Sequence, residues 1–391
     1  MKLLKLVMQG IPHFKDTMEI DFVAQQRVAD DDKEKLDNVF TNFYSNKTIS
    51  FIGINASGKT RTLKAISFVM NMLNNVPLNS IKTKDVFMDL GDGKQITITA
   101  YFYKDSCVKK LETIIKKEND PANGEAKLMI DDETLWSKNA EKIKTKKSIF
   151  DFTDKDFVGR RNKNEQYLLN DVSIIIAENS KNDGTQSGVP VIDTLDFTGH
   201  NLLTIGGNIP GTILRFLDPS IEYLICGSEG NKNDIRLKFC GSDEIVLNNP
   251  NLLQNYLSSG TIKGLNIFSS AAFVFGAGGY LVVDEIENHF NKEIVATLMR
   301  FFMDADVNNG AATLIFSTHY SELLDEFDRN DCIYIVKNVG GIGAENLSTI
   351  LKRNDLKKSE VYDSGYLENT APEYDSYFAL KKFLAGMHRE E

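Results

Sequence analysis

Alternating apolar and polar residues near the start of the chain predict a β-hairpin. Apolar side chains recur at every second position over residues 4–8 and again over 18–22. Pro12, His13 and Phe14 separate the two segments and predict a turn. We expect this hairpin to pack beside the next strand of the chain, over residues 48–54.

A glycine-rich turn follows that strand and precedes a helix. Residues 48–54 form an apolar run typical of a buried strand, and apolar spacing predicts a helix over 61–73. The turn between them reads Gly53-x-x-x-x-Gly58-Lys59-Thr60. Such a turn exposes backbone N–H groups around a phosphate, and it places lysine against the β- and γ-phosphates and the threonine hydroxyl near Mg²⁺.

The alternative is a glycine turn that matches the motif by chance. The strand before the turn and the helix after it argue against this alternative. The residues expected to bind the nucleotide are Gly53, Asn55, Ala56, Ser57, Gly58, Lys59, Thr60 and Arg61, with Lys59 also catalytic and Thr60 also a metal ligand.

The middle of the chain changes composition twice. Residues 23–46 are polar and predict an exposed loop or a short helix, and a strand is expected over 95–103. Over 104–169 many lysines alternate with acids, which predicts an insertion whose surface is either a solvated mixed-charge face or a nucleic-acid surface. The apolar run 172–177 fits a strand or a buried helix, 190–217 is helical in part, and 221–247 predicts strands.

The last third of the chain alternates between helical and strand patterns. Helices are expected over 258–275, 292–303 and 321–327, and strands over 280–283, 312–316 and 332–337. This order predicts βαβ units and a parallel sheet. The amphipathic segment 374–384 is expected to pack on the body, and the rest of the segment after Lys337 reads as a surface tail without a nuclease-like carboxylate cluster.

Composition narrows the cellular setting. The 391 residues carry a net charge of −10, so no whole-chain basic field attracts nucleic acid or an anionic membrane. The four cysteines form no C-x-x-C pair, which favours reduced thiols and argues against zinc. Lys5 interrupts the apolar start and Gly10 ends it, so we expect no signal peptide. No apolar run reaches the roughly 18 residues of a membrane span, and a cytoplasmic location is expected.

Two carboxylates follow the strand expected over 280–283. Asp284 and Glu285 come at its carboxyl end, which is the edge of an open α/β sheet where ligands bind. Asp284 is therefore a candidate Mg²⁺ ligand, and Glu285 is placed to polarise an attacking water. A solvated acidic turn after a buried strand is the alternative.

Two further segments carry candidate chemistry. Ser258, Ser259, Gly260 and Thr261 open a helix, where free N–H groups and the helix dipole favour an anion, although a serine at a helix start is also an ordinary cap. His319 follows the strand over 312–316 and can donate to a γ-phosphate. A partly buried surface histidine is the alternative.

The ordered set of these motifs resembles the ABC-type ATPase heads of the SMC and RecF kind. Ser258 and Gly260 stand in the signature position and His319 in the switch position. Residues 284–290 and 316–323 more narrowly resemble the AAA-type ATPases of bacterial abortive-infection and phage-defence operons, the RloA-like proteins among them. The resemblance covers 1–103 and 247–337. The sequence departs from the family pattern in two places. Gln95 and Gln166 are poor candidates for the Q-loop glutamine. Asn291 stands where a D-loop histidine is often found, with His289 two residues earlier.

This resemblance implies an α/β fold of the P-loop NTPase class. An ABC-ATPase-like head with a mixed sheet would carry an N-terminal β-hairpin lobe and an inserted α+β or helical subdomain. The expected units are 1–103 and 247–337 for the head, 104–246 for an insertion that partly returns to the β core, and 338–391 for a tail that packs on the head.

The resemblance also implies ATP and Mg²⁺ as cofactors and a homodimer that closes around two ATP molecules. Ser258, Ser259, Gly260 and Thr261 of one chain would then cover the γ-phosphate held by the other, and Glu285, His319 and Lys59 would be catalytic. One functional hypothesis is an antiphage ATPase that controls an effector protein from the same operon. Another is a RecF-like DNA-binding ATPase in repair or recombination, and an ABC importer subunit fits less well.

Overall fold

A six-stranded mixed sheet lies at the centre of the protein. The computed structural model describes residues 1–91, 93–119, 124–162, 168–179, 188–196, 202–228, 231–288, 290–368, 370 and 374–387. The central sheet has the order β10-β15-β16-β5-β17-β18, and its strands run parallel except for β18. The predicted α/β fold with a mixed sheet is thereby confirmed. Its strands are β5 (Thr48–Ile52), β10 (Val191–Asp193), β15 (Tyr280–Val283), β16 (Thr313–Thr318), β17 (Ile333–Asn338) and β18 (Ile342–Asn346).

A second, antiparallel sheet contains the N-terminal hairpin. Its order is β2-β1-β6-β7-β8-β9. The predicted hairpin is confirmed, but β1 pairs with β6 and does not lie beside β5. The reason is that β6 offers a long apolar face that matches β1 along its whole length, with Ile96, Ile98 and Ala100 fully buried. The strands are β1 (Lys2–Gln9), β2 (Thr17–Asp21), β6 (Gln95–Lys104), β7 (Cys107–Asn119), β8 (Ala126–Asn139) and β9 (Phe157–Arg160).

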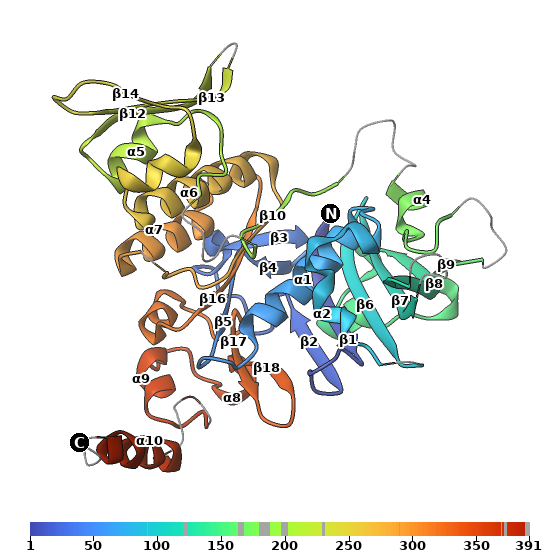
Figure 1. The fold of residues 1–391 in the computed structure, drawn as a ribbon. Helices are drawn as coiled ribbons and strands as arrows, with labels where there is room; N and C mark the ends of the chain where they lie inside the picture. The colour runs from blue at the N-terminus through green and yellow to red at the C-terminus, as the bar shows by residue number, and fades with distance from the viewer. Residues whose placement is uncertain are drawn as a thin grey trace.

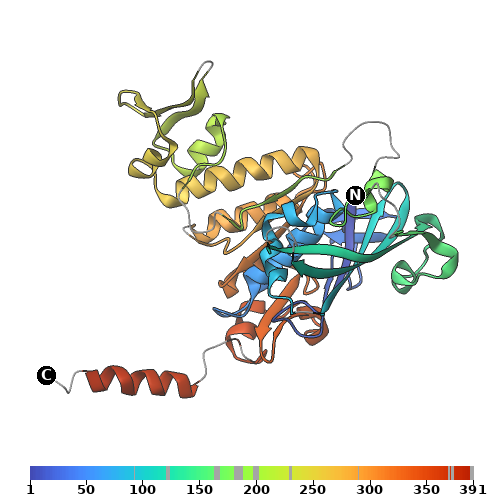
Figure 2. The same ribbon diagram turned by 45° about the vertical axis from the view of Figure 1, so that its right-hand side comes forward.

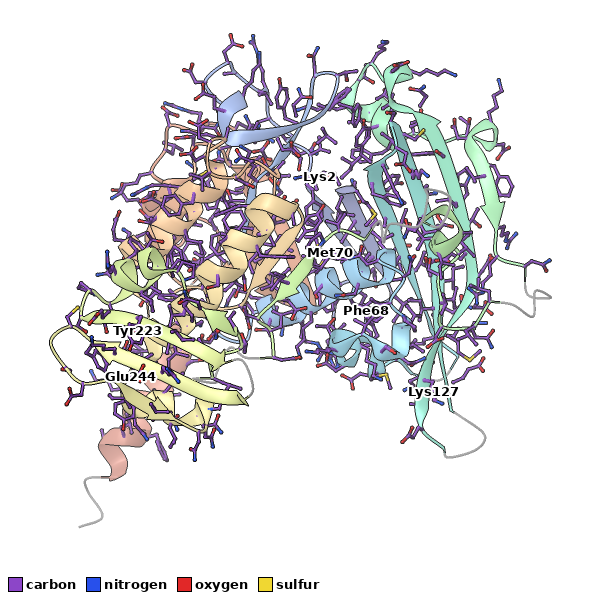
Figure 3. The ribbon with its side chains drawn as sticks, turned by 90° about the horizontal axis from the view of Figure 1, so that it is seen from above. Lys2, Phe68, Met70, Lys127, Tyr223 and Glu244 are labelled. Carbon is purple, nitrogen blue, oxygen red and sulfur yellow. The ribbon has the colours of Figure 1, made fainter. Side chains whose placement is uncertain are left out.

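Helix α1 (Lys59–Leu73) lies between these two sheets (Figure 1). One apolar cluster joins its side chains to both of them. Phe68 packs against Phe87 of α2 (Asp85–Met88) with a ring-centroid distance of 4.4 Å. Figure 3 shows Phe68 and Met70 on this helix, in the middle layer of the molecule. Because α1 is covered on both sides, its first turn, which follows the glycine-rich turn, is firmly placed.

Two further helices cover the opposite face of the central sheet. They are α6 (Ser259–Ala277) and α7 (Lys292–Met303), and Figure 2 shows them side by side. Phe275 and Phe302 join them with a centroid distance of 4.7 Å. The helix expected over 321–327 is a 3-10 helix, η7 (Ser321–Glu326).

A third sheet packs on the first half of α6. Strands were expected over 221–247, and the structure confirms them. Leu217 of α5 contacts α6 so closely that a Cβ on Gly264 would lie 2.6 Å from it. Figure 3 shows Tyr223 on this sheet and Glu244 just before β14, and the Tyr223 hydroxyl donates to Glu244 over 2.7 Å. The elements are β11 (Gly207–Asn208), α5 (Gly211–Leu217), β12 (Ile221–Ser228), β13 (Asn231–Phe239) and β14 (Ile245–Leu247).

The segment 104–246, expected as an insertion that partly returns to the β core, divides between these sheets. Its first part adds β7, β8 and β9 to the antiparallel sheet, and its last part forms the third sheet. The boundary expected after 103 lies within β6, and the boundary expected after 246 lies within β14. The apolar run 172–177, left open between strand and helix, leads into the short helix α4 (Ile175–Asn179).

Residues 23–46 are not merely an exposed loop. They contain a 3-10 turn, η1 (Lys33–Lys35), and a hairpin of β3 (Leu36–Phe40) and β4 (Phe43–Asn46). Phe40 and Phe43 are buried, with a ring-centroid distance of 5.1 Å. These aromatic anchors outweigh the polar composition. The remaining short helices are η2 (Leu78–Ser80), η3 (Lys82–Lys84), η4 (Ala140–Lys142), α3 (Lys146–Phe150), η5 (Asp154–Asp156), η6 (Pro250–Asn255) and α8 (Leu347–Ile350).

The C-terminal helix stands away from the body. Helix α9 (Lys358–Asp363) is bonded to η7, because the Ser359 hydroxyl donates to Asp325 over 2.5 Å. Helix α10 (Tyr374–Met387) extends into solvent (Figure 2), and residues 375–385 are all exposed. The prediction that this segment packs on the body is wrong, because amphipathic spacing shows that a helix has an apolar face but not which surface receives it. Across the described ranges, no helix combines the length and apolar character needed to cross a membrane.

Deleting residues 371–391 should leave the stability of the body unchanged. Helix α10 buries little area against the body, so its removal should shift the melting temperature by less than about 2 °C. Differential scanning calorimetry of the full and shortened chains measures this shift. A fall of more than about 5 °C would show that the helix packs on the body in solution.

Candidate active site

The glycine-rich loop, residues 53–58, connects β5 to α1 as the sequence predicts. Gly58 has φ of 101° and precedes the first helical residue. A Cβ at Gly58 would lie 2.6 Å from the Ile342 side chain, and one at Gly53 would lie 2.4 Å from the Val336 carbonyl oxygen. Both glycines are therefore required by the fold, so that the loop can pass beneath the neighbouring strands.

Lys59 bends back over this loop. Its Nζ donates to the carbonyl oxygens of Gly53 over 2.9 Å and of Ile54 over 3.1 Å, and it lies 3.4 Å from His319 Nδ1. Burial lowers the pKa of the Lys59 ammonium, and three neighbouring carboxylates oppose that shift. They are Asp284, Glu285 and Glu287.

Thr60 and Asp284 are direct neighbours. The Thr60 hydroxyl donates to Asp284 Oδ2 over 2.7 Å, and the Ser317 hydroxyl donates to Asp284 Oδ1 over 2.5 Å. Because β15, β16 and β5 are parallel, their carboxyl ends meet at one edge of the sheet. Thus the structure brings together the two residues that the sequence predicts as metal ligands.

Glu285 and His319 face each other across the same edge. Glu285 Oε1 lies 3.7 Å from His319 Nε2. An ammonium can only donate, so the Lys59 contact assigns an acceptor to Nδ1 and leaves the proton of a neutral ring on Nε2, toward Glu285. The imidazole therefore lies between the predicted phosphate-binding lysine and the predicted base.

Lys59, Thr60, Glu285 and His319 line one pocket of about 380 Å³, within the usual size range of small-ligand sites, and Asp284 lies behind Thr60. The turn of the N-terminal hairpin contributes His13, whose Nε2 lies 3.1 Å from Asp89, and Arg61 bonds to the same carboxylate over 3.2 Å. Figure 1 shows that these parts come from distant regions of the chain. The lining residues are His13, Asn55, Ala56, Gly58, Lys59, Thr60, Arg61, Glu285, His319, Asn338 and Ile342.

Residues 258–261 do not line this pocket. Ser258 caps α6, because its Oγ accepts the Thr261 N–H over 3.0 Å. One turn later, Lys263 Nζ donates to the Glu285 carbonyl oxygen over 3.3 Å. The four residues thus lie at the start of a helix that is bonded to the pocket's edge, without contributing to the pocket of their own chain.

Three positioning side chains were missed from the sequence. Glu287 is buried, and its Oε1 accepts the backbone N–H of His319 over 2.5 Å. Ser317 and Lys263 hold the two ends of the Glu285 backbone. Glu287 and Ser317 stood inside the segments that carried the family resemblance, and that was the only signal available for them.

The residues considered for the Q-loop and D-loop lie apart from this cluster or outside the description. Gln95 is exposed at the start of β6, and Gln166 and His289 fall outside the described residues. Asn291 caps α7 by accepting the Glu293 N–H over 3.0 Å. Asn291 therefore has a structural role.

The residues present fit the predicted cofactors. Hydroxyl and carboxylate oxygens from Thr60 and Asp284 suit Mg²⁺, which is commonly held by one or two carboxylates together with phosphate oxygens. Among the described residues no group of three His, Cys, Asp or Glu side chains could hold a metal alone. The buried Ser57 Oγ has no hydrogen-bond partner within the described residues, but Ser57 does not line the pocket.

A scan against models of known protein families finds no match to this chain, and a search of curated proteins finds none either.

Proposed function

We propose that this chain is an ABC-type ATPase that binds and hydrolyses Mg²⁺-bound ATP. One observation carries the proposal. The Thr60 hydroxyl bonds to Asp284, and the Lys59 ammonium reaches His319, at one end of a glycine-rich loop. Few activities other than nucleoside triphosphate hydrolysis or transfer require a lysine, a threonine and a carboxylate beside a glycine-rich loop at the carboxyl edge of a parallel sheet.

Each residue has a separate task in this proposal. The loop N–H groups and Lys59 bind and orient the phosphates, and Thr60 and Asp284 hold the metal ion. The metal ion supplies positive charge that offsets the charge of the phosphate oxygens in the transition state. Glu285 accepts a proton from the attacking water, and His319 stays oriented between Glu285 and Lys59.

We further propose that the active unit is a homodimer closed around ATP. Residues 258–261 lie at a helix start, where backbone N–H groups of the first turn have no partner within the helix, although Ser258 caps that of Thr261. All four residues lie outside the pocket of their own chain. A second copy can bring them to the γ-phosphate, which would make hydrolysis depend on assembly. From the sequence resemblance alone, we also propose that the chain is a regulatory ATPase of an antiphage system, whose nucleotide state controls an effector protein encoded beside it.

The alternative, a DNA-binding ATPase of the RecF kind, receives less support. The lysine-rich strands β7 and β8 form ion pairs within the sheet. Lys110 lies 3.1 Å from Glu112, and Lys116 lies 3.0 Å from Asp131. Such pairing reduces the positive field that a DNA phosphate backbone would meet.

Replacing Lys59 with methionine tests the nucleotide site. Lys59→Met keeps the length of the side chain but removes the ammonium, so affinity for a fluorescent ATP analogue should fall about tenfold or more. Lys64→Met is the matched control, because Lys64 lies on the same helix and pairs with Asp85 over 2.7 Å, outside the pocket. Equilibrium titration should give wild-type affinity for Lys64→Met. A wild-type chain that neither binds nor hydrolyses ATP would refute the proposed function.

A further inference from the structure

We infer that Ser317 is a positioning residue that orients both carboxylates of the proposed ATPase site. This inference rests on the proposed function. Ser317 lies in β16 and is fully buried. Its Oγ donates to Asp284 Oδ1 over 2.5 Å and accepts the backbone N–H of Glu285 over 2.7 Å. One hydroxyl therefore joins the proposed metal ligand to the proposed base.

The backbone of Glu285 requires such support. Its φ is 46°, in the left-handed region that residues other than glycine rarely adopt. Ser317 bonds to its N–H, and its carbonyl oxygen accepts from the Asn288 N–H over 2.9 Å and from Lys263 Nζ over 3.3 Å. Hydrogen bonds on both sides thus hold the conformation that presents the Glu285 side chain to the pocket.

The chemistry of the hydroxyl explains why a serine suits this position. A hydroxyl has one proton to donate and lone pairs to accept with. Because the proton goes to Asp284, the lone pairs remain for the Glu285 N–H, and both bonds fix each other's direction. With Oδ1 of Asp284 held in this way, Oδ2 stays on the side of Thr60, where the two proposed metal ligands meet.

A neighbouring serine offers a matched control. Ser50 lies on the adjacent strand β5, opposite Phe316, and is also fully buried. Its Oγ has no hydrogen-bond partner within the described part of the chain. Ser50→Ala therefore removes a buried serine hydroxyl from the neighbouring strand of the same sheet without removing a hydrogen bond to either carboxylate.

The test compares Ser317→Ala with Ser50→Ala in the full chain. Equilibrium binding of a fluorescent ATP analogue is titrated with Mg²⁺, and ATP turnover is measured in parallel. For Ser317→Ala we expect the Mg²⁺ concentration for half-maximal binding to rise about 10- to 100-fold and kcat to fall by a similar factor. Binding of the analogue in EDTA should stay within about twofold of wild type, because Lys59 and the loop are unchanged. Ser50→Ala should match wild type in every measurement.

A conservative variant keeps the inference testable if Ser317→Ala is too unstable to assay. Ser317→Thr retains the hydroxyl and suits a strand, so it should keep the wild-type dependence on Mg²⁺. The inference is overturned if folded Ser317→Ala behaves as Ser50→Ala does, or if folded Ser317→Thr is as impaired as expected for Ser317→Ala. A wild-type chain that binds no ATP would overturn the proposed function together with this inference, whereas the other two outcomes leave the proposed function intact.

Discussion

Glu285→Gln is expected to lower ATP turnover by about 10³-fold while leaving ATP binding unchanged. The side chain of Glu285 is 40% exposed and lines the pocket, where a water can reach it. Glutamine has the same shape but cannot accept a proton from that water. Because glutamine and glutamate meet the same backbone restriction at φ of 46°, the substitution should not alter the fold.

The same variant should accumulate as an ATP-bound dimer. Slow hydrolysis keeps the γ-phosphate that would join the two copies, so sedimentation velocity with Mg²⁺ and ATP should show a dimer, and without nucleotide a smaller species. Glu293→Gln is the control, since Glu293 pairs with Arg300 on α7 over 2.8 Å and lies outside the pocket. Identical sedimentation of Glu285→Gln with and without ATP would count against the dimer.

Gly260→Asp is expected to bind ATP with wild-type affinity and yet lose turnover by about 10²- to 10³-fold. Gly260 lies in the first turn of α6, outside the pocket of its own chain. A carboxylate there would repel the γ-phosphate presented by a second copy. It should not weaken the helix, because acids stabilise helix N-termini.

Gly276→Asp is the matched control for this prediction. It adds the same charge to the same helix, at an exposed position where nothing lies within 4 Å of an added Cβ. The measurements are steady-state hydrolysis and equilibrium binding of an ATP analogue for both variants. Undiminished turnover by Gly260→Asp would refute the shared site while leaving the glycine-rich loop as a nucleotide site.

The core of the site could be predicted because its parts are local in sequence. The strand, the glycine-rich loop and the helix over residues 48–73 form one continuous pattern, and β15 runs directly into Asp284. Strand-to-helix spacing and glycine positions depend on neighbouring residues alone. Parallel strands then bring Asp284, Glu285 and His319 to the edge where β5 ends, as βαβ order predicts.

Contacts between distant segments could not be predicted. Strand β1 pairs with β6, and β10 pairs with β15, although each pair is far apart in the sequence. The apolar pattern of a strand does not show which distant strand it will pair with. The roles of Ser317 and Glu287 depend on hydrogen bonds across two strands, and neither residue type is unusual at such positions. The lysine-rich stretch over 104–169 looked like an insertion because β7 and β8 carry polar outer faces, although their inner faces belong to the core.

Mixing two inactive variants tests the shared ATP site most directly. Lys59→Met damages the loop half of the site, and Gly260→Asp damages the helix half. A mixed dimer then has one site with both halves intact and one site with both halves damaged. Random exchange of equal amounts makes about half of the dimers mixed, so the mixture should recover about a quarter of wild-type turnover. Turnover by the mixture no higher than that of either variant alone would show that each chain hydrolyses ATP without the helix start of a second copy.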